Sequence, residues 1–238
     1  DDFDAEAHEA EVAQIVYTSG TTALPKGAAM THGAMIAQYQ SCIYGMEMRG
    51  TDRHIAALPL YHTAQMHAFL LPAFMTGAWQ LILPAPAPDV VLEAIERHRM
   101  TSFFAPPTVW IGLLRHADFD RRDLSCLRRI YYGASIMPVP VLQELRARLP
   151  GAAPYNCYGQ TEIAPLATML GPDDQLRKPG SAGRAVINVE TRVVDDQMRD
   201  VKPGDVGEIV HRSPHLMLGY FHDDERTKAA FEGGWFHS

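Results

Sequence analysis

Residues 18–27 read TSGTTALPKG and directly follow the apolar run VAQIVY at residues 12–17. The run is short and rich in β-branched and aromatic residues, so it predicts a buried strand that ends where the polar stretch begins. That stretch is a poor strand and a poor helix, because glycine, proline and small hydroxyl residues interrupt both. Turns of this composition expose backbone N–H groups and hydroxyls, and Lys26 adds a mobile positive charge. The segment therefore predicts a loop that binds phosphate.

This loop does not match the Walker pattern. Pro25 occupies the place where a glycine should precede the lysine, and Gly27 rather than serine or threonine follows it. A phosphate site here requires a different arrangement of the backbone. The alternative is a mobile loop that joins two elements, and composition alone does not separate the two.

The composition is that of a globular, acidic protein. Its 238 residues are 47 % hydrophobic, enough for a substantial core in one large domain or two smaller ones. A net charge of −7 argues against a nucleic-acid partner, because neutralising phosphates requires a basic face. No apolar run approaches the roughly 20 residues of a membrane-spanning helix, so we expect no transmembrane segment.

The cysteines and the chain ends give further expectations. Cys42, Cys126 and Cys157 are scattered and odd in number, which indicates a reducing compartment, so we expect a cytoplasmic protein without a disulfide framework. The cysteines and histidines lack metal-ligand spacing, which argues against a zinc site. The acidic start DDFDAEAHEAE and the abrupt end GGWFHS predict a fragment of a longer protein.

Strands and helices alternate along most of the chain. Thr31 is expected to cap a helix in which apolar residues recur at helical spacing as far as Ile43. Further strands are predicted at residues 54–58, 79–83, 102–105, 129–132 and 155–158, and further helices at 66–75, from a cap at Asp89 through Ile95, at 107–114 and at 138–149. This alternation predicts an α/β fold of parallel βαβ units with helices on the sheet faces.

The pattern changes from about residue 180. The segments VINVETRVVD and VGEIVHR alternate like strands with one face in solvent, and the turn KPGD separates them. They predict a small antiparallel sheet or barrel at the C-terminal end. The segment GPDDQLRKPG, at residues 171–180, reads as the connection between the two parts.

Two further segments end predicted strands with residues suited to a nucleotide. In YNCYGQTE, residues 155–162, the ring of Tyr158 can stack on a purine, Thr161 can reach a phosphate and the Glu162 carboxylate can hold magnesium. In YYGAS, residues 131–135, small residues follow the strand. The alternative for residues 155–162 is an ordinary strand-to-turn junction with a chance glutamate. The alternative for residues 131–135 is tight packing of a strand against a helix.

All three glycine-containing turns follow predicted strands. Open α/β sheets bind ligands in the crevice at the carboxyl ends of their parallel strands. Three such turns at one edge favour a nucleotide site over three unrelated turns.

Six segments in this order resemble the adenylate-forming superfamily, which includes acyl-CoA synthetases, luciferases and the adenylation domains of peptide synthetases. The segments are TSGTTALPKG, PLYHTA, YYGAS, YNCYGQTE, GSAGR and the final stretch GEIVHRSPHLMLGYFHDDERTKAAFEGGWFHS. The resemblance runs from residue 12 to 238 and is closest in style to fatty-acyl-CoA synthetases. It implies part of the large N-terminal domain of such an enzyme, with parallel and mixed sheets, flanking helices and a small antiparallel β subdomain.

The resemblance also implies a division of the chain. Residues 1–51 would hold the phosphate-loop part of a first α/β subdomain, and residues 52–175 a second one with the acyl and adenine sites. Residues 176–238 would form a truncated, barrel-like β subdomain. The C-terminal domain that supplies a catalytic lysine in the family would lie outside this chain.

The implied reaction has two steps. A small carboxylic acid attacks the α-phosphate of ATP to give an acyl-adenylate and pyrophosphate, and the thiol of CoA then displaces AMP. The resemblance thus implies ATP, AMP and CoA as ligands and Mg²⁺ as the metal. It leaves the oligomeric state open, and a homo-oligomer is compatible with it.

The resemblance implies a role for each matching residue. The β- and γ-phosphates would be wrapped by Thr18, Ser19, Gly20, Thr21, Thr22 and Lys26. Adenine would lie between Gly133, Ala134 and Ser135 on one face and Tyr158 with Gly159 on the other, with Asn156 at its edge. Thr161 would bind the α-phosphate, Glu162 would coordinate magnesium, and His62 would border the entry of the carboxylate. The expected catalytic residues are Lys26, His62, Thr161 and Glu162.

Ala23 departs from the family pattern, because it stands where the loop has a glycine. If that position needs a positive φ, alanine costs roughly 1 kcal/mol or more.

Two alternative functions stay open. One is an amino-acid or aryl-acid adenylation domain that loads a carrier protein, and the other is a truncated module that binds without turnover. The segment PLYHTAQMHAF offers apolar groups and histidines rather than an aspartate, which favours an acid with an uncharged tail. His67, within it, is either a pocket residue or a core residue.

Overall fold

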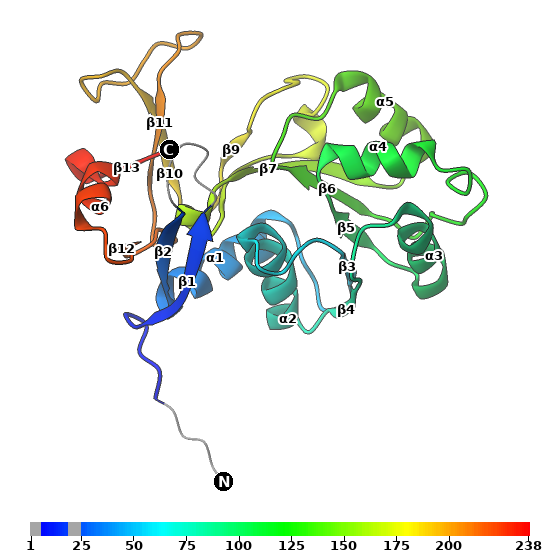
Figure 1. The fold of residues 1–238 in the computed structure, drawn as a ribbon. Helices are drawn as coiled ribbons and strands as arrows, with labels where there is room; N and C mark the ends of the chain where they lie inside the picture. Colours follow the sequence, from blue (N-terminus) through cyan, green and yellow to red (C-terminus); the bar gives the residue numbers. More distant parts are fainter. Residues whose placement is uncertain (1–5, 19–24) are drawn as a thin grey trace.

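The computed structural model describes residues 6–18 and 25–238 (Figure 1). In these ranges the strands form three sheets, and the largest has seven strands. Its strands, in spatial order, are β4 (Trp79–Ile82), β3 (Arg53–Ala56), β5 (Ser102–Phe104), β6 (Arg129–Gly133), β7 (Ala153–Gly159), β8 (Leu166–Leu170) and β9 (Arg184–Ala185). The first five are parallel, whereas β8 and β9 are antiparallel to their neighbours. The predicted α/β fold with a parallel, mixed sheet is confirmed.

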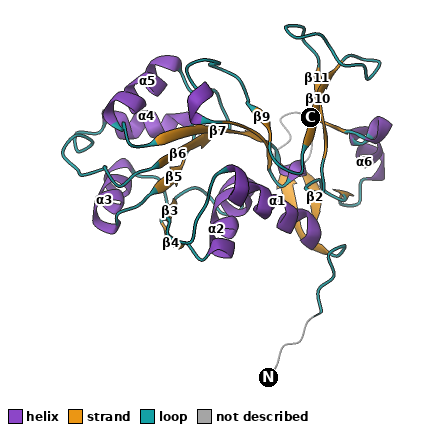
Figure 2. Ribbon diagram, turned by 180° about the vertical axis from the view of Figure 1, so that it is seen from behind, coloured by secondary structure: helices purple, strands orange, loops and turns teal. Residues whose placement is uncertain are grey.

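Helices cover both faces of this sheet (Figures 1 and 2). They are α1 (His32–Gly45), the π-helical segment η1 (Ala64–Leu70), α2 (Leu71–Thr76), α3 (Pro88–His98), α4 (Pro107–Arg115) and α5 (Val139–Arg148). Because side chains alternate along a strand, Phe103 packs with α3, α4 and α5, while its neighbour Phe104 packs with η1 and α1 on the other face. The sheet therefore has a separate hydrophobic core on each face.

Two antiparallel sheets of three strands complete the described structure. One joins β1 (Val12–Thr18), β2 (Lys26–Thr31) and β12 (Gly219–Tyr220), and the other joins β10 (Glu190–Val194), β11 (Glu208–Arg212) and β13 (Phe236–His237). The second sheet confirms the antiparallel element predicted after residue 180. A short helix, α6 (Asp224–Ala230), lies between β12 and β13.

Strand β2 was not predicted. Its sequence, KGAAMT, is mostly small residues and carries no alternating pattern. It nevertheless pairs with β1, and a Cβ at Gly27 would lie 2.8 Å from Cγ2 of Ile15, so any larger residue would force the Ile15 side chain to shift. Residues 19–24 of the phosphate-loop segment therefore connect two antiparallel strands rather than a strand and a helix.

The predicted helix starts are right in one case and wrong in another. Thr31 caps α1, since its hydroxyl accepts a hydrogen bond from the Ala34 N–H at 3.1 Å. Asp89 does not cap α3: the N-cap is Ala87, and Pro88 takes the first helical position. Proline suits that position because its φ is already helical and it lacks the N–H that would stay unpaired. Asp89 lies in the first turn, where its charge is favourable.

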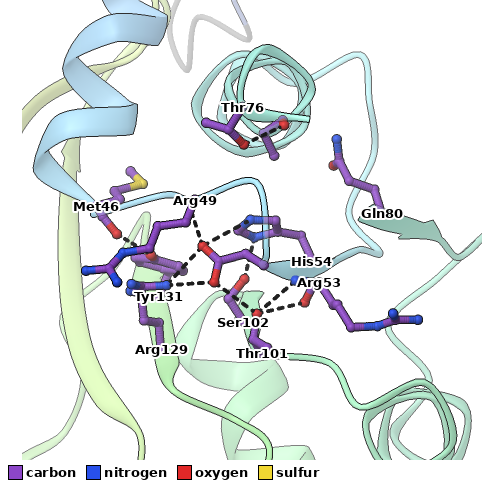
Figure 3. A network of polar contacts seen from close by, with 12 residues as sticks. Met46, Arg49, Arg53, His54, Thr76, Gln80, Thr101, Ser102, Arg129 and Tyr131 are labelled. Atoms are coloured by element: carbon purple, nitrogen blue, oxygen red, sulfur yellow. Dashed lines mark hydrogen bonds and ion pairs between the residues drawn. The ribbon is translucent and has the colours of Figure 1, made fainter. Parts of the chain in front are cut away.

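A buried polar network joins the amino ends of β3, β5 and β6 (Figure 3). Arg129 Nη1 donates to both carboxylate oxygens of Asp52 at 3.1 Å, and Ser102 Oγ bonds Nδ1 of His54. Burial lowers the pKa of His54 to about 4, so its imidazole is neutral near pH 7. Ser102 is fully enclosed, so this serine, histidine and aspartate pin the sheet edge and do not form an accessible catalytic triad.

Two expectations from composition concern the whole chain. Within the described ranges, no helix combines the length and apolar character needed to cross a membrane. Cys42, Cys126 and Cys157 all lie in these ranges and carry free thiols.

Candidate functional site

The turns after β6 and β7 lie side by side, because the two strands are parallel neighbours with Gly133 opposite Cys157. Two hollows open beside these turns and share Ala134, Cys157, Tyr158 and Gly159. The Phe104 hollow, of about 210 Å³, is lined by Thr63, Ala64, Ala68, Phe69, Phe104, Gly133, Ala134, Cys157, Tyr158, Gly159, Gln160, Thr161, Pro165 and Leu166. The Ser135 hollow, of about 360 Å³, is lined by Ala134, Ser135, Ile136, Asn156, Cys157, Tyr158, Gly159, Gly180 and Ala182.

Backbone contacts explain the glycines of both turns. A Cβ at Gly133 would lie 2.5 Å from the carbonyl oxygen of Cys157, and one at Gly159 would lie 1.8 Å from that of Pro165. Neither position has room for a side chain. Ala134, which lines both hollows, has φ of +64°, a conformation that is uncommon outside glycine and often found at functional sites.

The Phe104 hollow is apolar at one end and polar at the other. Phe69 and Phe104 stack in parallel with ring centroids 4.2 Å apart. At the polar end, the hydroxyls of Thr63 and Thr161 are 3.4 Å apart. Burial raises the pKa of Cys157 to about 12, so its thiol stays neutral.

The Ser135 hollow contains the side chains expected around a base. Asn156 Nδ2 donates to the carbonyl oxygen of Ser181 at 3.1 Å, which fixes its amide plane and leaves its second N–H available. The Tyr158 hydroxyl is 2.9 Å from Ser238 Oγ. Ser135 is exposed, and it follows Ala134 at the end of β6.

Lys26 and Glu162 meet through a third residue, Tyr220. Lys26 Nζ donates to the Tyr220 hydroxyl at 3.0 Å, and this hydroxyl donates to Glu162 Oε1 at 2.8 Å. The ammonium also lies 4.4 Å from the centre of the Tyr220 ring. Tyr220 and Glu162 are each 7 % exposed. Burial, and then the charge of Glu162, raises the pKa of Tyr220 well above its usual value, so the hydroxyl keeps its proton.

Sequence reasoning missed Tyr220, although it lies within the last segment of the family resemblance. Strand β12 has only two residues, too few for a recognisable pattern. Its pairing with β2, with Tyr220 opposite Ala28, is what brings the hydroxyl to Lys26. The sequence analysis also missed Thr63, Phe69 and Phe104, because their apolar segments are equally typical of the hydrophobic core.

The other expected site residues differ in placement. His62 is exposed and lines neither hollow, although the adjacent Thr63 does. His67 is a core residue: it is buried, with Nδ1 2.6 Å from the Tyr39 hydroxyl and Nε2 2.6 Å from Gln14 Oε1. Thr18 Oγ1 is buried without a hydrogen-bond partner among the described residues. The calls on Ser19, Gly20, Thr21, Thr22 and Ala23 fall outside the described residues.

Glu162 is the expected magnesium ligand, and its surroundings fit a hard cation that also binds phosphate. In the part of the chain that the structure describes, no group of three or more histidine, cysteine, aspartate or glutamate residues converges on one point. Mg²⁺ commonly takes only one or two protein carboxylates and completes its shell with water and substrate phosphates. A hydrogen bond to Oε1 from Tyr220 orients the Glu162 carboxylate, as such outer partners do for metal ligands.

Comparisons with known proteins identify the family of this chain. A family model described as AMP-binding enzyme matches residues 2–221. The chain is 36 % identical over 224 residues to an indoleacetate–CoA ligase of Aromatoleum aromaticum, covering 94 % of this chain and 44 % of the relative. It is 33 % identical over 233 residues to the medium-chain fatty-acid–CoA ligase of Escherichia coli, covering 97 % and 41 %.

Solved structures give the same result. The O-succinylbenzoate coenzyme A synthetase of Bacillus subtilis, in complex with ATP and magnesium ion, superposes with a TM-score of 0.89 at 29 % identity, covering 98 % of this chain and 47 % of that one. The chain spans less than half the length of the curated relatives it matches. With the family model matching nearly the whole chain, the resemblance found in the motifs is confirmed, and the chain belongs to the AMP-binding enzyme family.

Proposed function

We propose that this chain is the nucleotide- and acid-binding part of an AMP-forming acyl-CoA ligase. The observation that carries the proposal is the pair of hollows that meet at Ala134 and Tyr158, with Thr161 at the polar end of one of them. The Ser135 hollow carries Asn156 and Tyr158, which suit a base, and the Phe104 hollow carries the aromatic rings of Phe69 and Phe104. The relatives support the reaction type, since their names describe ligases that join different acids to CoA.

The proposed chemistry begins with an ionised carboxylate, which needs no general base near neutral pH. One carboxylate oxygen forms a bond to the α-phosphorus of ATP, and the bond from that phosphorus to the oxygen bridging to the β-phosphate breaks. Pyrophosphate leaves with that oxygen. In the second step the sulfur of CoA bonds to the acyl carbon, the thiol proton is released, and AMP leaves with the oxygen that joined it to the acyl group.

The residue roles proposed here follow from the family resemblance and the placement of the side chains. Thr18, Ser19, Gly20, Thr21, Thr22 and Lys26 would bind the β- and γ-phosphates; Gly133, Ala134, Ser135, Asn156, Tyr158 and Gly159 would hold adenine; Thr161 would bind the α-phosphate; and His62 would border the carboxylate's entry. In-line displacement at phosphorus depends mainly on positioning and charge neutralisation. An acidic protein must therefore provide local cations at this point.

Tyr220 has a positioning role in this proposal. Its hydroxyl accepts from Lys26 and donates to Glu162, so it separates a cation and an anion that would otherwise pair directly. The remaining N–H groups of Lys26 and the second oxygen of Glu162 then serve phosphate and Mg²⁺. Glu162 would hold the Mg²⁺, which supplies neutralisation of phosphate charge.

The rival functions make different demands on the Phe104 hollow. An amino acid requires a carboxylate for its ammonium group, and none of the residues lining this hollow is charged. The uncharged wall thus supports an acid with a neutral tail, such as a fatty or an aryl acid. A binding module without turnover would take up ATP and acid and form no adenylate.

Several features of the whole protein are also part of this proposal. They are the division at residues 51/52 and 175/176, the separate lysine-bearing domain, the cytoplasmic location and a homo-oligomeric state.

Pyrophosphate exchange tests the proposed function. The intact protein should exchange labelled pyrophosphate into ATP only when a cognate carboxylic acid and Mg²⁺ are present, because only the acyl-adenylate step is reversed in this assay. ATP binding should be measured in parallel by calorimetry. Binding of ATP without exchange, across fatty, aryl and amino acids, would establish the binding module instead.

A further inference from the structure

The Phe104 hollow has a small volume and an uncharged lining, which together restrict the acid that it can take. An apolar cavity of about 150 Å³ accommodates one benzene molecule. Scaled by carbon number, the 210 Å³ of this hollow corresponds to about eight carbon atoms. A single ring with a short side chain has this number of carbon atoms, whereas a long acyl chain has far more.

The aromatic part of the lining is supported by further rings. Behind the stacked Phe69 and Phe104, the ring of Tyr131 lies 5.2 Å from that of Phe69, and Tyr155 lies 5.4 Å from Tyr131. The fully buried Tyr131 donates its hydroxyl to the Met46 carbonyl oxygen at 2.8 Å (Figure 3). This hydrogen bond holds the Tyr131 ring in place, and that ring in turn supports Phe69.

The side walls are formed by small residues. Ala64 and Ala68 lie one turn apart on η1, and Gly133 and Ala134 lie at the end of β6. Small side chains on these walls leave room for a flat group, and the parallel Phe69–Phe104 pair offers it an aromatic surface. Aromatic rings pack well on such surfaces in offset-stacked or edge-to-face arrangements.

We infer that the acid activated at this site is a compact aryl or arylalkanoic acid, with one ring, an uncharged tail and about eight carbons. This inference rests on the proposed function and adds the substrate class. The carboxylate would lie at the polar end beside Thr161, and the ring would lie against Phe69 and Phe104.

Matched acids separate shape from size. Phenylacetate and octanoate have the same number of carbons, so they compare a ring with a chain, and palmitate tests length. In pyrophosphate exchange with the intact protein, phenylacetate or benzoate should give a kcat/KM at least fivefold above octanoate and at least a hundredfold above palmitate. Phenylalanine should give no exchange, because its ammonium would be buried without a partner.

Two variants test whether the acid binds in this hollow. Ala64→Leu fills it and should lower kcat/KM for phenylacetate at least tenfold while ATP binding, measured by calorimetry, stays unchanged. Phe104→Ala enlarges the hollow and removes one aromatic ring from its lining, so it should raise the octanoate-to-phenylacetate ratio of kcat/KM at least tenfold. Phe104→Leu serves the same purpose if the alanine variant does not fold. Ala147→Leu, on an exposed face of α5, is the matched control. It should change neither the kcat/KM for phenylacetate nor the octanoate-to-phenylacetate ratio.

The outcomes distinguish this inference from the proposed function. Exchange that is as efficient with palmitate or octanoate as with phenylacetate would overturn the aryl-acid inference and leave the ligase proposal standing. An Ala64→Leu variant with unchanged use of phenylacetate would also overturn it. Absence of exchange with every acid would instead refute the proposed function.

Discussion

Tyr220 shows how one hydroxyl can organise two charged groups. It lies between Lys26 and Glu162, with one hydrogen bond to each, and it is held on β12 by pairing with β2. A second contact fixes its backbone, because Thr227 Oγ1 accepts a hydrogen bond from the Tyr220 N–H at 2.8 Å. The residue is therefore placed by backbone structure rather than by its charged partners.

Removal of this hydroxyl should alter the use of Mg²⁺. In Tyr220→Phe the ring remains, but Lys26 and Glu162 can pair directly and then compete with phosphate and metal. Hydrogen bonds to charged groups contribute about 1.5–3 kcal/mol, so we expect the Mg²⁺ concentration for half-maximal pyrophosphate exchange to rise about tenfold or more.

Tyr132→Phe is the matched control for this prediction, because the buried Tyr132 hydroxyl bonds Gln175, away from the charged pair. It should keep the parental Mg²⁺ dependence. Equal Mg²⁺ titrations for Tyr220→Phe and the parent would mean that the bridge has no role in positioning.

At the scale of the element, the phosphate-loop segment differs most from its sequence-based description. The small residues after Lys26 form strand β2, whose edges pair with β1 on one side and β12 on the other. Thr31 then ends the strand and begins α1. The strands on either side of this loop are thus paired with each other, and β2 continues directly into a capped helix.

Thr31→Ala tests that junction. Loss of the side-chain acceptor for the Ala34 N–H should lower the free energy of unfolding by about 1 kcal/mol. For a chain of this size the melting temperature should fall by about 2–4 °C. Calorimetry should show no such shift for Thr51→Ala, which changes an exposed turn residue. A parental melting temperature for Thr31→Ala would show that the cap is dispensable.

At the scale of the whole molecule, three buried histidines connect neighbouring elements of the fold. His54 joins strands of the large sheet, His211 bonds Thr191 between β10 and β11, and His215 bonds Ser41 on α1. Burial lowers the pKa of each of the three to about 4, below the ordinary value near 6.5. All three are neutral in the folded protein at pH 7.

The free energy of unfolding should consequently decrease as the pH is lowered. Between pH 6.5 and 4 these histidines take up protons in the unfolded chain but not in the folded one, so acid favours unfolding. Each should remove about 1–2 kcal/mol of stability between pH 7.5 and pH 5. Urea unfolding at these two pH values measures the change.

Single-histidine variants test the assignment. His211→Asn should reduce the pH dependence by about one histidine's share, whereas His222→Asn, at an exposed turn, should leave it unchanged. Stability that is equal at pH 5 and pH 7.5 would contradict the prediction.

The sequence by itself determined the alternation of strands and helices, the Thr31 cap and the motifs at Gly133 and Thr161, because each depends on neighbours within a few residues. Only the tertiary structure decided where β2 and β12 pair, that Tyr220 joins Lys26 to Glu162, and that Phe69 and Phe104 line the same hollow as Thr161. Lys26 and Tyr220 are separated by 194 positions, and a contact over that distance arises from strand pairing, which leaves no local pattern in the sequence.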